Sequence, residues 1–320
     1  SKQMIYGKIT LEDWRTACVE GEEPESSFES YNLRLFFFGT LYNRDTLQAT
    51  PDDTNAKLAA DAFLSDPAYG FSRLDGSFTI VYYSENECGV VRDHHGTHYP
   101  VYCHIDGNFA TSWQFLEDQL EENFEPNLVS LSTFLQRGIL KKNNFALFDV
   151  HSLGAGEKFY MLTELGYLMP VWASVKLETQ AKVHSMFDSL KERNPSLYEK
   201  VADDIYCLKR DSVFEHEPKV ATERNPDVET YSRRYGELHA QAIRRRIGHS
   251  RRVGILLSGG YDSGSNLAAL RSIYDGQIDS YSVGFKGDAW TELPMARLMS
   301  ETFGTRHHEY EIDGTEISAL

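Results

Sequence analysis

The chain has 320 residues, of which 41% are hydrophobic and 25% are charged, and its formal net charge is -16 at pH 7. This length and composition indicate a folded protein with two domains and argue against a fibrous or disordered chain. Nucleic acids bind mainly through Lys and Arg side chains that neutralise phosphates, so the acidic balance disfavours a nucleic-acid partner. No apolar run is long enough to cross a membrane and no signal core follows the polar start, so we expect a cytoplasmic protein without a membrane partner.

Four cysteines are present, and their spacing matches no metal-binding pattern. A chain of this size does not depend on a disulfide framework, so we expect reduced and mostly buried thiols. These residues are Cys18, Cys88, Cys103 and Cys207.

The first half of the chain alternates short apolar runs with turn residues, a pattern that indicates β-strands. Helical patterns cover residues 54–64 and 113–119. We therefore predict a mixed α and β domain over residues 1–172. Its expected strands are residues 33–38, 77–83, 87–92, 100–104 and 108–112, followed by a pair at 157–161 and 168–172.

Residues 173–227 are rich in charged and polar side chains, and we predict a helical connector that leads into a linker. An amphipathic pattern then predicts a helix over residues 228–247. Its last turn carries Arg244, Arg245 and Arg246, which complement the helix dipole or, in an alternative interpretation, contact a phosphate.

The second domain, over residues 228–320, continues with alternating strands and helices. Strands are expected at residues 252–257 and 278–285, and helices at 264–274 and 291–303. Such alternation predicts a parallel sheet with crossover helices, so the chain combines an α+β domain with an α/β domain.

A glycine loop, Ser258-Gly-Gly-Tyr-Asp-Ser263, follows directly on the apolar strand. Ligands of parallel sheets bind at the carboxyl ends of the strands. Two glycines let the backbone approach a ligand closely, and a helix that begins near Ser263 presents free N–H groups to an anion. We therefore predict a phosphate-binding loop. The alternative is a tight turn in which Asp262 or Ser263 caps the helix.

The loop lacks the lysine with which the common ATPase loop contacts the β- and γ-phosphates. It resembles instead the loop of N-type ATP pyrophosphatases, which split ATP between the α- and β-phosphates and leave AMP. The resemblance implies ATP and Mg²⁺ as cofactors, with Asp262 as the metal ligand. The expected nucleotide-binding residues are Leu257, Ser258, Gly259, Gly260, Asp262, Ser263 and Val283.

Downstream segments resemble asparagine synthetases, a family whose ATP pyrophosphatase domain has the adenine nucleotide α-hydrolase-like fold. The resemblance places Val283 against adenine, whereas the alternative is an ordinary core valine. His307 and His308 fit the start of a strand and lack partners for a metal site. The matching segments are residues 280–285, 290–297 and 304–309.

Residues 31–172 resemble the glutaminase domain of the same family, which has the αββα Ntn-hydrolase fold. The matching segments are residues 34–43, 74–78, 92–96, 100–102 and 153–156.

The same domain departs from the family at the residues that hydrolyse glutamine. That reaction uses an N-terminal cysteine, but this chain begins with Ser1 and has no cysteine before Cys18, so no catalytic residue is assigned. The family's Asn-Gly-Glu strand reads Phe38-Gly39-Thr40 here, and a phenyl ring cannot donate a hydrogen bond to the oxyanion. We therefore predict a glutaminase-type domain without glutaminase activity.

The resemblance implies an ATP-dependent ligase that adenylates a carboxylate on a small molecule or peptide and then forms an amide. Loss of glutaminase activity favours an amine within the substrate or free ammonia, as in the β-lactam synthetases and lasso-peptide cyclases of natural product biosynthesis. Asparagine synthesis from ammonia or glutamine is one alternative, and a non-catalytic relative that binds nucleotide or a partner is another. A tRNA-modifying pyrophosphatase uses a similar loop, but the acidic charge disfavours it.

The family's second acidic Mg²⁺ loop and its catalytic lysine have no counterpart before Leu320. The ATP pyrophosphatase domain is therefore expected to be incomplete in this chain. A second chain that completes it, or a homodimer, is the expected assembly.

Overall fold

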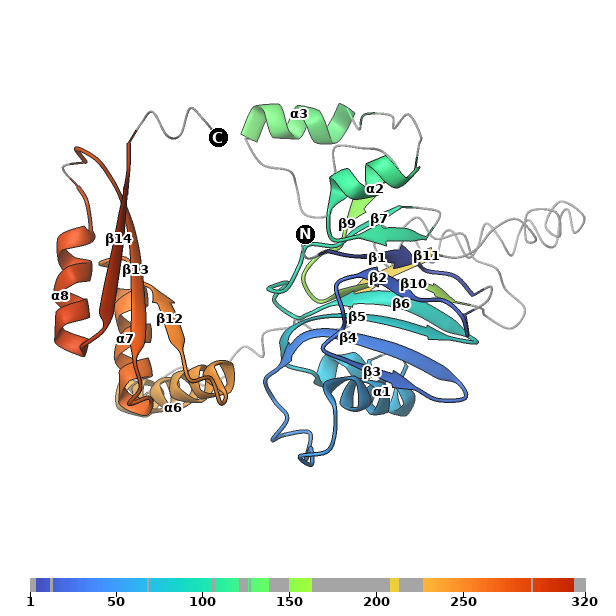
Figure 1. The fold of residues 1–320 in the computed structure, drawn as a ribbon, viewed down its shortest axis with the longest axis horizontal. Helices are drawn as coiled ribbons and strands as arrows, with labels where there is room; N and C mark the ends of the chain where they lie inside the picture. Colours follow the sequence, from blue (N-terminus) through green and yellow to red (C-terminus); the bar gives the residue numbers. More distant parts are fainter. Residues whose placement is uncertain are drawn as a thin grey trace, which may run out of the picture. The chain divides into compact units, whose positions relative to one another are not determined.

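The chain divides into two compact units, residues 1–217 and 218–320, in the computed structural model (Figure 1). No helix in the described part of the chain has both the length and the hydrophobicity of a membrane span. The structure describes residues 4–11, 14–67, 69–104, 107–120, 126, 128–137, 150–162, 208–212, 227–288 and 290–313.

A six-stranded antiparallel sheet forms the centre of the first unit, in the order β11-β10-β6-β5-β4-β3. β4 and β5 pair along their whole length, from Leu33 opposite Ser84 to Leu41 opposite Gly76. The strands expected at residues 33–38, 77–83, 87–92 and 157–161 are confirmed. The strand bounds are Ser26–Glu29 (β3), Leu33–Leu41 (β4), Gly76–Ser84 (β5), Glu87–Arg92 (β6), Glu157–Leu162 (β10) and Leu208–Ser212 (β11).

A second sheet of five short strands has the order β2-β1-β8-β7-β9. The strands predicted near residues 100–104 and 108–112 are confirmed as β7 and β8. β1, β2 and β9 were not predicted, since each is too short to show an alternating pattern. The bounds are Ile5–Lys8 (β1), Val19–Gly21 (β2), Tyr102–His104 (β7), Asn108–Ala110 (β8) and Val150–Ser152 (β9).

The two sheets and two helices of this unit form four layers. Helix α1, Asn55–Ser65, packs on the six-stranded sheet, where Phe63 meets Tyr82. Helix α2, Trp113–Leu120, packs on the outer face of the five-stranded sheet through Leu116. A core between the sheets contains residues of both, among them Ile5, Phe38, Val81, Val90 and Phe109. The order is therefore helix, sheet, sheet, helix (Figure 1), which is the αββα layering implied by the resemblance.

The 3-10 helix η1, Gly70–Arg73, and helix α3, Leu128–Arg137, complete the described elements of this unit and were not predicted. Three cysteines are described, and none of them forms a disulfide: Cys88 and Cys103 are buried, and Cys18 is exposed.

The prediction that residues 173–227 form a helical connector and a linker was wrong for residues 208–212. β11 pairs antiparallel with β10, from Met161 opposite Leu208 to Glu157 opposite Ser212, and so extends the six-stranded sheet. The sequence Leu-Lys-Arg-Asp-Ser is polar, as edge strands often are, and its partner lies far away in the chain, so local pattern gave no strand signal. Most of the rest of this segment, and the strand predicted at 168–172, lie outside the described residues.

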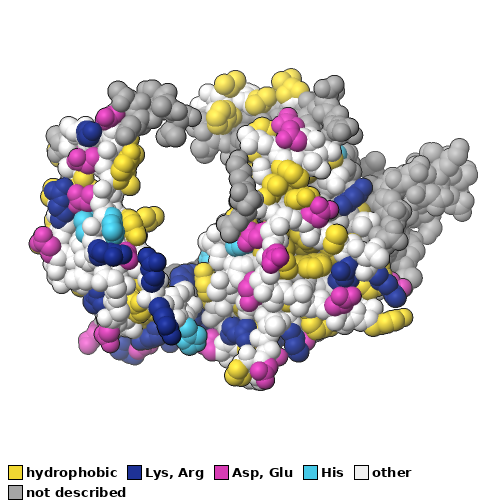
Figure 2. Space-filling model, viewed as in Figure 1, with side chains coloured by type: hydrophobic (Ala, Val, Ile, Leu, Met, Phe, Trp, Pro, Cys, Tyr) yellow, Lys and Arg dark blue, Asp and Glu magenta, His cyan; other side chains and the backbone are white. Residues whose placement is uncertain are grey.

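The second unit is the predicted α/β arrangement, a parallel sheet in the order β12-β13-β14. Its core, which includes Val253, Leu267 and Ile278, lies on one face of the sheet. The other face leaves Leu256 80% exposed and Val283 62% exposed, and Figure 2 shows hydrophobic side chains gathered along one side of this unit. The elements are Val228–Ile247 (α6), Val253–Leu256 (β12), Tyr261–Ile273 (α7), Ile278–Phe285 (β13), Leu293–Phe303 (α8) and Arg306–Ile312 (β14).

Candidate nucleotide-binding site

The glycine loop connects the end of β12 to the start of α7, at the carboxyl edge of the parallel sheet. Gly260 is the N-cap residue, with φ -82° and ψ 165°, and no side chain hydrogen-bonds to the cap. The first N–H groups of a helix have no acceptor within the helix. Since no side chain caps α7, these groups are available to an anion at the positive end of the helix dipole.

The alternative prediction that Asp262 or Ser263 caps the helix is wrong, because both residues lie inside the first turn of α7. Ser263 instead holds the loop together. Its Oγ accepts a hydrogen bond from the Ser258 amide at 3.1 Å and lies 2.9 Å from the Ser258 hydroxyl. The Gly260 amide donates to Ser258 Oγ at 3.2 Å.

Gly259 is required by packing against the start of α8. A Cβ atom at this position would lie 2.8 Å from the carbonyl oxygen of Glu292 and 2.8 Å from the Cβ of Met295. Both distances are shorter than real Cβ contacts, so any side chain would push the loop away from α8. The glycine therefore lets the loop lie directly against the N-terminus of a second helix.

A cavity of about 380 Å³ lies beside the loop, between β12, β13 and α8, and its size is within the range of small-molecule sites. Four predicted residues line it: Leu257, Ser258, Ser263 and Val283. The other predicted residues, Gly259, Gly260 and Asp262, are not among the lining residues. The structure adds Leu256, Tyr281, Ser282, Glu292, Leu293 and Ala296.

The added residues lie on β12, β13 and at the start of α8, which only the folded structure brings together. Leu256 stands opposite Tyr281 in the parallel register of β12 and β13, which brings the carboxyl ends of the two strands together. Ser282 donates a hydrogen bond to the Leu257 carbonyl across the same strands. The alternation along residues 278–285 could have identified the β13 residues, because one face of that strand lies next to the glycine loop.

Val283 is not a core valine, since it is 62% exposed and lines the cavity. Asp262 is also exposed, and its carboxylate has no ion pair within the described residues. No group of three His, Cys, Asp or Glu side chains in that part of the chain could hold a metal ion by itself. Mg²⁺ commonly binds through one or two carboxylates together with substrate phosphates and water, so the chemistry of Asp262 suits a metal carried by a nucleotide.

The two histidines of β14 are part of hydrogen-bond networks between strands. His308 Nε2 lies 3.2 Å from Asp279 Oδ1, and hydrogen bonds from Arg306 and then His308 lower the pKa of Asp279. His307 Nδ1 lies 2.8 Å from the Ser280 hydroxyl. The expectation that these histidines belong to a strand is confirmed, and their contacts join β14 to β13.

In the first unit, two sequence segments of the glutaminase resemblance meet through Arg92. Its guanidinium donates to the carbonyls of Leu153 at 2.6 Å and Gly96 at 2.8 Å. Burial lowers the pKa of Arg92. Asp93 accepts hydrogen bonds from the amides of Thr97 and His98, so this loop is organised around a buried carboxylate.

Phe38 and Gly39 occupy the strand position where the family has its oxyanion donor. Phe38 is buried in the core between the two sheets, where its ring has no hydrogen-bonding group. Gly39 has φ +108°, and a Cβ atom there would lie 2.2 Å from the Ser77 carbonyl oxygen. Gly39 is therefore structurally required here, whereas the Phe38 side chain beside it offers no hydrogen-bond donor.

A parallel sheet with a glycine loop and an uncapped helix N-terminus at its carboxyl edge defines an α/β domain that presents an anion-binding edge. Residues 234–320 match the family model described as asparagine synthase. No curated protein matches the chain.

Two solved structures are similar at 12% identity. One is described as the allosteric regulatory enzyme of purine biosynthesis, with a TM-score of 0.31 over 91% of this chain and 62% of that one. The other is glutamine phosphoribosylpyrophosphate amidotransferase from B. subtilis complexed with ADP and GMP, with a TM-score of 0.29 over 90% of this chain and 73% of that one. The chain thus spans 62% of the length of the first structure. These scores are too low to establish a shared overall fold.

Proposed function

We propose that the chain is part of an ATP-dependent, AMP-forming ligase that joins a carboxylate to an amine in the cytoplasm. The single observation that carries the proposal is the uncapped N-terminus of α7 beside the cavity, in a segment that matches the asparagine synthase family model. An anion at that helix end and a flat ring against Val283 would share one site.

In this proposal each residue of the site has a defined role. The free amides of the first turn of α7, next to Gly259 and Gly260, bind the pyrophosphate part of ATP, and Ser258 and Ser263 hold the loop in its binding shape. Asp262 would hold Mg²⁺, which would supply positive charge to neutralise the leaving pyrophosphate. Val283 packs on the adenine ring.

The chemistry takes place in two steps. A carboxylate oxygen of the substrate attacks the α-phosphorus of ATP, the bond from that phosphorus to the pyrophosphate oxygen breaks, and pyrophosphate leaves. An amine nitrogen then attacks the acyl carbon, AMP leaves with the bridging oxygen, and the nitrogen loses a proton. These steps give one amide, one AMP and one pyrophosphate.

Features of the first unit favour a reaction in which the attacking amine does not come from glutamine. Its layers fit an Ntn-hydrolase-like fold of the glutaminase type, but Phe38 replaces the oxyanion donor, and loss of one such donor costs about a hundredfold or more in rate. We therefore place the protein with ligases that use an amine within the substrate, like β-lactam synthetases and lasso-peptide cyclases, or that use ammonia.

The first test is nucleotide binding by the chain as it stands. ATP with Mg²⁺ is titrated into the protein in a calorimeter, with GTP and with ATP in EDTA as comparisons. Selective, Mg²⁺-dependent binding of ATP supports the proposal, and equal binding of ATP and GTP contradicts the role of Val283 in adenine recognition.

The second test concerns turnover. Release of pyrophosphate and AMP is measured with candidate carboxylates, and ¹⁵N-ammonia shows whether the amide nitrogen is external. Nucleotide binding without either product, in the complete assembly, would assign the protein to the non-catalytic relatives.

A further inference from the structure

Helix α6, Val228–Ile247, leaves much of its surface open to solvent. Ile243 and Ile247 contact the core of the second unit, and His239 Nε2 lies 2.7 Å from Asn266 Oδ1 on α7. None of the 20 residues of α6 is buried. Most of the stability of a helix in a protein comes from packing of its apolar face, so the exposed side of α6 is a candidate contact surface.

An apolar stripe runs along α6, apart from the residues that contact the core. Its large side chains are all exposed, with Tyr235 66% and Leu238 49% accessible. At about 100° per residue, the stripe lies about a third of a turn from Ile243. The steps between its members alternate between three and four residues, which is the heptad spacing of helices that pack on another helix. The α6 stripe consists of Val228, Tyr231, Tyr235, Leu238 and Ala242.

The two ends of the same helix carry opposite charges. Asp227 caps the N-terminus and Glu229 lies in the first turn, whereas three arginines occupy the last turn. Two parallel copies of α6 would place these arginines together, and juxtaposed like charges repel. An antiparallel pair places the arginines of each copy beside the acidic end of the other, where Arg and carboxylate groups attract. The arginines are Arg244, Arg245 and Arg246.

In an antiparallel pair the α6 stripe is complementary to itself. If Tyr235 stands opposite Leu238 of the second copy, the spacing places Tyr231 opposite the second copy's Ala242. A large ring then faces a small side chain, which lets facing layers interdigitate. A two-fold dimer uses the same patch on both subunits, so one stripe per chain is sufficient.

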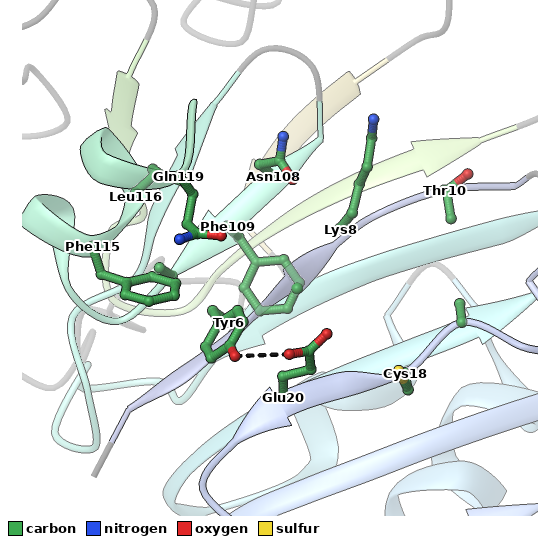
Figure 3. A pocket seen from close by; sticks show the side chains of 13 residues that line it. Tyr6, Lys8, Thr10, Cys18, Glu20, Asn108, Phe109, Phe115, Leu116 and Gln119 are labelled. Atoms are coloured by element: carbon green, nitrogen blue, oxygen red, sulfur yellow. Dashed lines mark hydrogen bonds between the residues drawn. The ribbon is translucent and has the colours of Figure 1, made fainter. Parts of the chain in front are cut away.

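The groove of the first unit is too small to hold this helix. It has a volume of about 300 Å³ beside α2, whereas a helix of 20 residues is about 30 Å long. Figure 3 shows the Lys8 ammonium pointing away from the Glu20 carboxylate, which accepts from the Tyr6 hydroxyl at 2.7 Å. A short groove with charged side chains does not match a long apolar stripe, so α6 of a second copy is the better match.

We propose that two copies of the chain associate through antiparallel pairing of α6, with the α6 stripe of each copy packed against that of the other. The contact is independent of the ATP-binding proposal, since no residue of the stripe lines the cavity beside the glycine loop.

Sedimentation equilibrium of the complete chain, between about 1 and 100 µM, measures the association. We expect a reversible equilibrium between monomer and dimer. Tyr235→Glu and Leu238→Glu should each raise the dissociation constant at least about a hundredfold, about tenfold for each of the two carboxylates that the contact would bury. Tyr31→Glu makes the same change at an exposed tyrosine of the first unit and should leave the association unchanged. Since all three side chains are exposed in the chain, the variants should keep the fold, which circular dichroism verifies.

Cysteine cross-linking determines the direction of the pairing, in a background with Cys18→Ser and Cys207→Ser. The antiparallel arrangement brings Val228 of one copy beside Arg245 of the other. A mixture of Val228→Cys and Arg245→Cys chains, oxidised with diamide, should therefore form a disulfide between the two variants, which peptide mass spectrometry identifies.

Three results would overturn the proposal. The first is a monomer at all of these concentrations. The second is a dimer that persists in both stripe variants, because another surface would then hold it together. The third is a disulfide of the Val228→Cys variant with itself in place of the mixed one, because the two helices would then run parallel.

Discussion

The hydroxyl oxygens of Ser258 and Ser263 lie 2.9 Å apart across the glycine loop. Ser263 also accepts from the Ser258 amide, and its hydroxyl lies 3.2 Å from the Gly260 carbonyl oxygen. One side chain in the first turn of α7 thus fixes both ends of the loop that precedes it. The shape of the anion-binding edge depends on this contact.

Replacement of Ser263 by alanine should therefore weaken binding of ATP with Mg²⁺. Loss of these hydrogen bonds costs about 1–2 kcal/mol, which corresponds to about tenfold in the dissociation constant. Calorimetry measures the affinity, and circular dichroism checks that the fold is retained. Ser265→Ala is the matched control, because the only hydrogen bond of its hydroxyl within the described residues goes to the Asp262 carbonyl. Equal affinities of the two variants would contradict the role of Ser263.

The Asp262→Asn variant tests the metal ligand. The amide keeps the shape of the side chain but removes the charge that attracts Mg²⁺. We expect about tenfold weaker ATP binding in the presence of Mg²⁺ and no change in EDTA, because one charge-assisted contact is lost. Asp275→Asn, an exposed aspartate at the other end of α7, should behave as the native chain does. A variant that loses the same affinity with and without metal would show that Asp262 acts on the loop instead.

A buried ion pair makes a separate prediction about stability. Lys158 Nζ lies 2.9 Å from Glu87 Oε1, both side chains are buried, and the Tyr82 hydroxyl donates to the same carboxylate. Lys158→Met leaves that carboxylate buried without its cation, at a cost of about 3–5 kcal/mol in the free energy of unfolding. Urea unfolding followed by circular dichroism measures the change.

Two further variants complete this test. Lys57→Met removes a cation from an exposed pair with Asp61, so its effect should stay below about 1 kcal/mol. A triple variant, Lys158→Met with Glu87→Leu and Tyr82→Phe, should regain most of the lost stability, since no polar group is left unpaired at the site. If the triple variant is as unstable as the single one, packing rather than charge explains the loss.

Two glycines in different surroundings test whether the backbone conformation and the space around a glycine decide the effect of adding a Cβ atom. Gly39→Ala forces a side chain onto φ +108° and within 2.2 Å of the Ser77 oxygen, which should destabilise the first unit by about 2–4 kcal/mol. Gly236 lies inside α6 with open space around its Cα, so Gly236→Ala should stabilise that helix by about 0.5–1 kcal/mol. Thermal unfolding of both variants gives the sign of each change. Similar small effects would mean that the strand at Gly39 relaxes.

His98 predicts a dependence of stability on pH. Burial lowers its pKa below 6.5, against the opposing influence of Glu22 and Asp93, and its Nδ1 lies 3.0 Å from the Thr79 hydroxyl. The unfolded chain therefore binds more protons than the folded chain as the pH falls below about 6.5, and the free energy of unfolding decreases in that range. The His98→Asn variant should show a smaller decrease between neutral pH and the acid range in urea titrations. An unchanged slope would assign the dependence to other groups.

The sequence alone was sufficient to predict each helix or strand whose apolar residues recur at a helical or strand spacing. Helix α1, strands β4, β5 and β6, and the whole β12 to α8 alternation follow from the sequence, because each is long enough to show its buried face. The glycine loop also follows, since two adjacent glycines between an apolar strand and a helix have few structural solutions.

Pairing between distant segments was decided by the tertiary structure. β11 is polar and becomes a strand only because β10 offers its edge, and β1 and β2 are too short for a pattern of their own. The same holds for the sites. Ser263 was identified as a loop residue, but its role in holding Ser258 could be seen only in the folded loop. Tyr281 could not be assigned to the cavity beside that loop before β12 and β13 are in register. A sequence specifies periods and turns locally, whereas register and cavities arise when burial of apolar faces selects one pairing among many.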